Sequence, residues 1–215
     1  MGWFHRIATK CTCAQHLYFF HFFIKKAIFR FSMNKSHVTI FIDSSYNPGR
    51  KLGVGGFLCI PHNPGETPAN EDMFETWYFP DAVKTRIVEN TTNTRLELQT
   101  LLWALESLTL ENGNKASEKR GFITIYTDCL TAVDLPGRRK RLEDVYYLSK
   151  RKGSVLRNAD IYKSIFALYD EFLPKLVWIK GHTLKKDRVG VHKIFSEVDR
   201  LVRNHLRTYI ARTCS

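Results

Sequence analysis

The sequence predicts an α/β fold with one open, mixed sheet of five strands and helices on both faces. Three alternating apolar segments follow one another, at 37–43, 52–61 and 73–79. After them, helical and strand patterns alternate, with a helix at 94–110, a strand at 121–128, a helix at 159–172, a strand at 175–180 and a helix at 195–210. Successive strands favour an antiparallel meander, and strands separated by helices favour parallel crossovers.

Each segment carries its own signal. Residues 37–43 alternate and are rich in β-branched side chains, and the turn after them contains the tripeptide NPG. Segment 52–61 has three glycines, which allow another backbone to approach closely. In the helix at 94–110, a stripe of leucines predicts one buried face, namely Leu98, Leu101, Leu105 and Leu108.

Glu97 lies within the arc of that leucine stripe, at the first turn of the helix, where a carboxylate is unexpected. One explanation is a capping box, because Thr94 and Glu97 have the S/T-x-x-E spacing that turns the glutamate back to the helix start. The other is that Glu97 points inward because it takes part in a polar site. The helix alone leaves both open.

Net charge and cysteine content indicate the kind of partner and the cellular compartment. The 215 residues carry a net charge of +12, which favours a polyanionic partner, either nucleic acid or an acidic membrane. The five cysteines are odd in number and scattered, with no pair at zinc-ligand spacing. We therefore expect reduced thiols and a cytoplasmic location.

Residues 1–32 differ from the rest, with five basic residues, no acidic residue and seven of the fifteen phenylalanines. Their apolar run LYFFHFFI has eight residues, far fewer than the roughly 20 that span a bilayer, so we expect no stable membrane insertion. The favoured interpretation is a start-site artefact, with Met33 as the true start. A Ser-poor transit peptide and surface association with an anionic membrane are alternatives. Residues 33–215 then form one domain.

Two of the predicted strands end alike, in TIFID at 39–43 and TIYTD at 124–128. If these strands are parallel neighbours, Asp43 and Asp128 share one face and emerge at the same edge of the sheet. Each aspartate taken alone is explained as a turn or cap residue.

Asp199 lies on the apolar face of the last helix, which also contains Phe195, Val202, Leu206 and Ile210. A carboxylate there is costly to desolvate unless it pairs with a Lys or Arg from another element or binds a metal. Four clustered carboxylates, including Glu97, would repel one another unless divalent cations neutralise them. Oxygen ligands suit Mg²⁺ or Mn²⁺, and two such ions about 4 Å apart promote phosphoryl chemistry.

Several motifs together resemble the type 1 ribonucleases H. They are FIDSSYNPG with GVGGF, TNTRLELQTLLWALESL, ITIYTD, NADIY, VWIKGH and the Asp199 helix, in the family's order and covering nearly all of the chain after Met33. The resemblance implies a ribonuclease H-like fold. It also implies an endonuclease that hydrolyses the RNA strand of RNA–DNA hybrids, largely independently of sequence, leaving 3′-hydroxyl and 5′-phosphate ends.

The resemblance also implies roles for individual residues. Asp43, Glu97, Asp128 and Asp199 would hold two Mg²⁺ ions, with Mn²⁺ as a substitute. Asp43 would bridge the ions, and Glu97 would help to orient water and the ribose 2′-hydroxyl. His182 would assist proton transfer or product release.

Substrate contacts follow from the same comparison. Asn47, Asn93 and Thr94 would face the minor groove and sugar hydroxyls, with Thr92 near a DNA phosphate. The basic insertion at 138–152, which opens with Arg138, Arg139, Lys140 and Arg141, lies where many members of the family carry a protrusion that grips the hybrid. A solvated charged face is its alternative. We expect a monomer.

The chain departs from the family pattern at Ser44, where Gly is usual, and at Cys129 and Leu130, where a polar pair is usual. The 17 positions from His182 to Asp199 form a long loop. These departures bear on substrate geometry more than on the metal site. Alternatives are a nuclease of the same fold with another substrate and a non-catalytic hybrid-binding module, although the complete acidic set argues against the module.

Overall fold

The computed structural model of the chain describes residues 37–62, 80–112 and 122–213, except 182, 185, 187 and 189. The chain divides into two units, Met1–Asn34 and Lys35–Ser215, and every described residue lies in the second. The expected extension at 1–32 and the predicted strand at 73–79 therefore lie outside the described residues.

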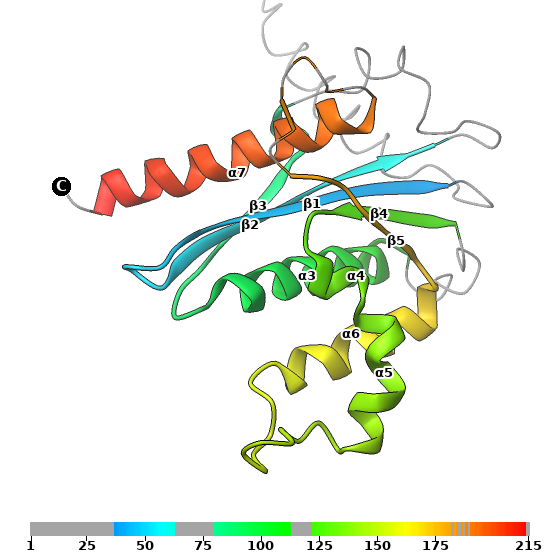
Figure 1. Cartoon of the computed structure of the whole chain (residues 1–215). Helices are drawn as coiled ribbons and strands as arrows, with labels where there is room; N and C mark the ends of the chain where they lie inside the picture. The colour runs from blue at the N-terminus through cyan, green and yellow to red at the C-terminus, as the bar shows by residue number, and fades with distance from the viewer. Residues whose placement is uncertain are drawn as a thin grey trace, which may run out of the picture. The chain divides into compact units, whose positions relative to one another are not determined.

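Five strands form one sheet in the order β3-β2-β1-β4-β5 (Figure 1). Their bounds are β1 Val38–Asn47, β2 Leu52–Pro61, β3 Lys84–Val88, β4 Ile123–Thr127 and β5 Lys175–Trp178. β2 runs antiparallel to β1 and β3, whereas β4 is parallel to β1 and β5. The predicted α/β class is confirmed, with a mixed sheet whose antiparallel strands come first and whose parallel strands follow.

Helices cover both faces of the sheet. They are α3 Asn93–Asn112, α4 Leu130–Val133, α5 Leu135–Asp144, α6 Ala159–Phe172 and α7 Val191–Thr213, with a short 3₁₀ turn, η2, at Pro80–Ala82. α7 packs on β1 and β2 from one side, α3 packs on the same strands from the other, and α6 packs on α3 (Figure 1). No helix in the described part of the chain is both long and apolar enough to cross a membrane.

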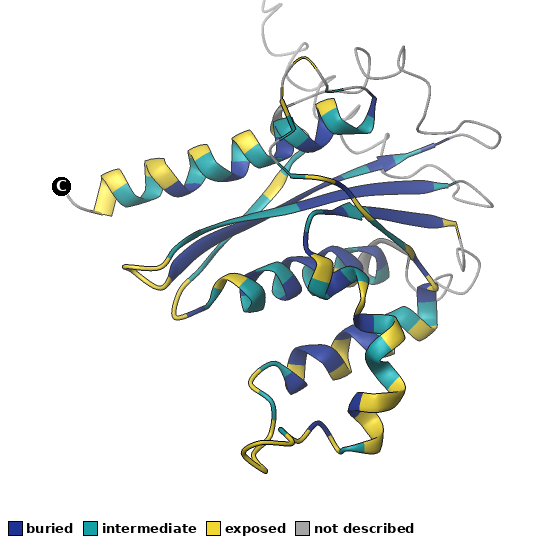
Figure 2. Ribbon diagram, in the orientation of Figure 1, coloured by how far each residue is buried: buried dark blue, intermediate teal, exposed yellow. Residues whose placement is uncertain are grey.

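The central strand, β1, is buried between helices on both faces of the sheet. All residues from 38 to 42 are buried, as expected for a strand with helices on both sides (Figure 2). Towards α7, Phe41 packs in one apolar cluster with Val198 and Val202. On the opposite face the predicted leucine stripe of α3 is buried, which confirms the inward face that contains Glu97.

The third strand of the described sheet is one that the sequence pattern did not indicate. β3 has the sequence KTRIV, in which Lys84 and Arg86 are exposed and carry their cationic ends over the rings of Phe57 and Trp103. An edge strand pairs on one side only and often carries such charges, so its apolar alternation is weak. Hydropathy therefore favoured the more apolar segment at 73–79.

Two further expectations need correction. The first strand does not end at Asp43, because pairing with β2 continues β1 as a hairpin arm to Asn47. The last helix begins at Val191, four residues before the predicted start, although its apolar stripe begins near Phe195. In addition, α4 and α5 lie between the fourth and fifth strands, where the predicted order allowed a second helix without giving its bounds.

The packing of α7 on β2 predicts a stability difference between two glycine substitutions. A Cβ at Gly56 would lie 2.5 Å from Cγ2 of Val202, whereas a Cβ at Gly137 on α5 meets nothing within 4 Å. Gly56→Ala should therefore destabilise the fold by about 1–3 kcal/mol, and Gly137→Ala should be neutral or stabilising. Urea unfolding followed by circular dichroism measures both, and equal stabilities for the two variants would contradict this packing.

Candidate active site

Three of the four predicted carboxylates line one small pocket. Asp43 on β1, Asp128 just after β4 and Asp199 on α7 surround a space of about 160 Å³. The register explains how the two strands contribute, because Phe41 is paired with Tyr126 and each aspartate follows two residues later. Phe41 and Tyr126 also stack, with ring centroids 5.1 Å apart, on the face that α7 covers.

The pocket concentrates negative charge. Burial raises the pKa of Asp43 well above its usual value, and the nearby charges of Asp128 and Asp199 raise it further. A hydrogen bond with Asp199 acts in the same direction, while the backbone N–H of Ser44 lowers the pKa. Asp43 therefore keeps a proton at pH values where an exposed aspartate is ionised, unless a cation compensates.

Glu97 approaches the pocket from α3 but is held by two donors. Its Oε1 accepts a hydrogen bond from Nδ2 of Asn93 at 2.7 Å, and its Oε2 accepts one from Sγ of Cys129 at 3.0 Å. Burial raises the pKa of Glu97, and the charge of Asp128 contributes in the same direction. Glu97 therefore lies close enough to Asp128 to respond to its charge.

The capping-box explanation of Glu97 does not hold. α3 begins at Asn93, so Thr94 lies inside the helix and cannot be its cap. The residue before the helix is Thr92, whose Oγ1 accepts a hydrogen bond from the backbone N–H of Arg95 at 3.4 Å. The side chain of Glu97 is turned to Asn93 and Cys129.

Asp199 has an ionic partner, although not from another element. Nη2 of Arg203 donates a hydrogen bond to Oδ2 of Asp199 at 2.5 Å, one turn along α7. The Asp199 side chain is 16% exposed, so the pair lies at the edge of the core. Arg203 also lines the acidic pocket. It was missed in the sequence analysis, although an i, i+4 acid–base spacing on a helix is the signal that could have found it.

As the side chains stand, no three His, Cys, Asp or Glu residues in the described ranges form a group ready to hold a metal ion. Three aspartates nevertheless line one pocket, because a shared pocket requires only neighbouring residues, whereas a metal site requires their oxygens to converge. The backbone brings the acidic residues together, whereas Glu97 and Asp199 direct oxygens to protein donors. The donor set still suits Mg²⁺, since it consists of carboxylates whose mutual repulsion a cation would relieve.

The loop after β5 passes close to Asp128. A Cβ at Gly181 would lie 2.5 Å from Oδ2 of Asp128, so glycine is required there for the close approach. Nε1 of Trp178 donates a hydrogen bond to the Asp128 carbonyl at 3.2 Å. His182, the predicted proton-transfer residue, follows Gly181 and lies outside the described residues.

The predicted substrate residues are divided among different contacts. Oδ1 of Asn47 accepts a hydrogen bond from the backbone N–H of Arg50 in the β1–β2 turn, and Asn93 holds Glu97. Thr94 is half-buried on the first turn of α3. Thr92 lines a second pocket, of about 510 Å³, whose walls are Tyr46, Lys51, Asn90, Thr91, Thr92, Arg95, Arg157 and Asp160.

The basic insertion begins with α5, and part of its charge is used within the fold. Arg139 forms one ion pair with Glu143 within α5 and another with Asp170 that joins α5 to α6, and Lys140 pairs with Asp144. Arg138 is half-buried, whereas Arg141 and the three residues at 150–152 are exposed. The surface available to a phosphate backbone is therefore smaller than the count of basic residues indicates.

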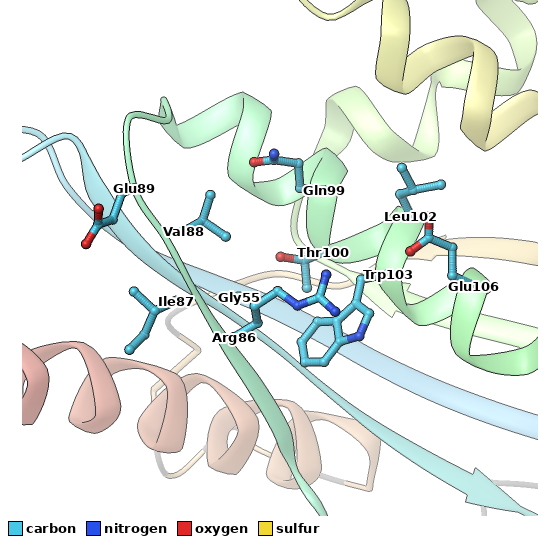
Figure 3. Close-up of a pocket in the computed structure, with 10 residues that line it drawn as sticks. All are labelled: Gly55, Arg86, Ile87, Val88, Glu89, Gln99, Thr100, Leu102, Trp103 and Glu106. Atoms are coloured by element: carbon cyan, nitrogen blue, oxygen red, sulfur yellow. The ribbon is translucent and has the colours of Figure 1, made fainter. Parts of the chain in front are cut away.

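A third cavity, of about 440 Å³, lies between β3 and α3 and contains none of the predicted carboxylates (Figure 3). The guanidinium of Arg86 lies 4.5 Å from the ring centroid of Trp103, which also contacts Phe57 edge-on. This stack covers the one aromatic residue on the polar side of α3.

No protein-family model matches this chain, and no curated protein matches it significantly. The resemblance to ribonucleases H therefore depends on the motifs quoted above.

The raised pKa of Asp43 predicts how stability depends on pH without divalent ions. A carboxyl whose folded pKa is raised stabilises the fold below its unfolded pKa, and this contribution is lost as the pH rises through the folded pKa. Asp43→Asn should therefore unfold at higher urea than the parent chain at pH 8 in EDTA, with the difference shrinking towards pH 4. Urea titrations at several pH values measure this.

Asp160→Asn is the matched control. Its ion pair with Arg95 lowers the pKa of Asp160, so the aspartate stabilises the fold above its unfolded pKa and this is lost as the pH falls. The control should thus be neutral or slightly destabilised at pH 8. A stability advantage for Asp160→Asn equal to that of Asp43→Asn would contradict the charge crowding at Asp43.

Proposed function

We propose that this chain is a metal-dependent ribonuclease H, an endonuclease that hydrolyses the RNA strand of RNA–DNA hybrids. The observation that carries the proposal is the convergence of Asp43, Asp128 and Asp199 on one pocket, with Glu97 beside it. These residues come from two parallel strands and two helices on opposite faces of the sheet. The strand order supports a ribonuclease H-like fold.

The four carboxylates would hold two Mg²⁺ ions, with Mn²⁺ as a substitute. Bound ions of this kind activate water and neutralise charge that develops on a scissile phosphate. Asp43 would hold an ion as the ionised carboxylate, and Glu97 and Asp199 would have to turn oxygens from their protein donors towards the pocket. Burial and the hydrogen bond to Glu97 raise the pKa of Cys129 to about 12. Its neutral thiol would therefore remain a donor for the second oxygen of Glu97.

Recognition of the hybrid would use the start of α3. Asn93 and Thr94 lie on the turn that also presents Glu97, so groups that contact sugar hydroxyls are adjacent to the catalytic carboxylate. The pocket containing Thr92 also has Lys51 and Arg157 in its walls, and these cations suit a phosphate of the DNA strand. His182 would transfer a proton or assist product release.

The basic insertion would add affinity that does not depend on sequence. Arg141 and the basic residues at 150–152 are exposed and suited to a phosphate backbone, whereas Arg139 mainly joins α5 to α6. Binding through such contacts weakens steeply as salt rises. Cys59 and Cys129 carry reduced thiols, in keeping with a cytoplasmic enzyme, and the proposal also takes the enzyme to be a monomer.

A second candidate is a nuclease of the same kind with another nucleic-acid substrate. It is favoured by the residues after Asp128, where Cys129 is buried against Glu97 and Leu130 is 56% exposed. Neither side chain offers the polar groove contact that the family usually has at these positions. A non-catalytic hybrid-binding module remains a third alternative, against which the complete acidic set argues.

A cleavage assay tests the proposal. The full chain is incubated with end-labelled RNA–DNA hybrid, double-stranded RNA or single-stranded RNA, in Mg²⁺ or EDTA. We expect Mg²⁺-dependent cleavage of the hybrid's RNA strand, with 3′-hydroxyl ends. Asp43→Asn should lower the rate by more than ~100-fold, since changes to groups that only support metal ligands cost roughly 10–100-fold. Glu197→Gln, which lies outside both the acidic pocket and the pocket containing Thr92, should cleave normally.

Other outcomes discriminate among the alternatives. Hybrid cleavage that persists in EDTA or in Asp43→Asn would exclude the two-metal site. Preferred cleavage of double-stranded RNA would favour the second candidate. Hybrid binding without cleavage under any condition would favour the non-catalytic module.

A further inference from the structure

One cation is built into the wall of the acidic pocket. Arg203 lines it together with Asp43, Asp128 and Asp199, and its guanidinium hydrogen-bonds Asp199. A guanidinium stays protonated at all ordinary pH values, so this positive charge is permanent.

The bond between Arg203 and Asp199 is incomplete. It consists of a single hydrogen bond, from Nη2 of Arg203 to Oδ2 of Asp199. A bidentate pair, with two parallel hydrogen bonds, would be stronger. Nε of Arg203 is buried and lacks a hydrogen-bond partner among the described residues. The Arg203 side chain is 40% exposed, so a better partner for Asp199 would displace a single partly solvated contact and leave the guanidinium open to water.

The same helix contains a natural comparison. Arg200 pairs with Glu197 at 2.7 Å, but it is exposed and does not line the acidic pocket. Both pairs join neighbouring turns of α7, so they make similar contributions to the helix. Only the Arg203 pair engages a carboxylate that the proposed function assigns to metal binding.

We propose that Arg203 is a positioning residue that serves as an internal counter-cation, holding Asp199 in the metal-free protein and releasing it when divalent ions bind. The proposal rests on the proposed function, because it takes Asp199 to be a metal ligand. Arg203 and an ion compete for the same carboxylate, and their like charges repel. The residue therefore stabilises the empty site and sets the concentration of Mg²⁺ at which the site fills.

Metal binding to the full chain, without nucleic acid, tests this role. Mg²⁺ affinity is measured by calorimetry and Mn²⁺ affinity by electron paramagnetic resonance, for the parent chain, Arg203→Gln, Arg203→Lys and Arg200→Gln. Loss of an ion pair worth about 1 kcal/mol should tighten binding roughly fivefold in Arg203→Gln. Arg203→Lys, which keeps the charge, should lie between it and the parent, and Arg200→Gln should match the parent.

Thermal unfolding gives a second readout that does not involve activity. Without divalent ions, Arg203→Gln should melt below the parent chain, because Asp199 then loses its ion pair in a pocket that it shares with Asp43 and Asp128. Saturating Mg²⁺ should raise its melting temperature more than that of the parent, since a ligand that binds more tightly to the folded state stabilises it more. Arg200→Gln should respond to Mg²⁺ as the parent does.

The outcomes separate the two proposals. Unchanged or weaker Mg²⁺ binding by Arg203→Gln, with binding by the parent that Asp43→Asn abolishes, would overturn the role of Arg203 and leave the metal site intact. Binding that survives Asp43→Asn, or no binding by the parent chain, would overturn the metal site and the role of Arg203 together. Equal effects of Arg203→Gln and Arg200→Gln would show that Arg203 acts only through helix stability.

Discussion

Repulsion among carboxylates at the junction of β1, β4 and α7 is the constraint on which the rest of the structure depends. Parallel pairing of β1 with β4 sets Asp43 level with Asp128, and the packing of Val198 and Val202 on Phe41 brings Asp199 to the same pocket. Favourable apolar packing thus offsets the electrostatic repulsion among these carboxylates. Crowded like charges of this kind are typical of functional sites, and binding of a cation that neutralises them is the simplest function that they could serve.

Groups of the protein itself offset this repulsion in the structure. Asp43 retains a proton, Arg203 neutralises Asp199, and Asn93 with Cys129 satisfies both oxygens of Glu97. Each of these contacts stabilises the protein without bound ions, and under the proposed function the Asp43 proton and the Arg203 bond would be given up when ions bind. The Cys129 bond is of special interest, because it uses a residue that departs from the ribonuclease H pattern to orient one that matches it.

Sequence periodicity predicted the parts of the fold that depend on burial. The inward face of α3, the central pair of strands and the place of Asp199 on the apolar side of α7 all follow from residues that water must not reach. It failed where burial is weak, as at the charged edge strand β3, and where local partners decide. The capping role of Thr94 and the choice of Arg203 over a distant cation depend on where a helix starts and which rotamer an arginine adopts, and neither is encoded in hydropathy.

Anomalous diffraction from crystals grown with Mn²⁺ and an RNA–DNA hybrid tests the central claim most directly. The account predicts two anomalous peaks in the pocket, each coordinated by carboxylate oxygens of Asp43 and of at least one other of Glu97, Asp128 and Asp199. A pocket without anomalous density at saturating Mn²⁺, with these side chains still bonded to their protein donors, would contradict it.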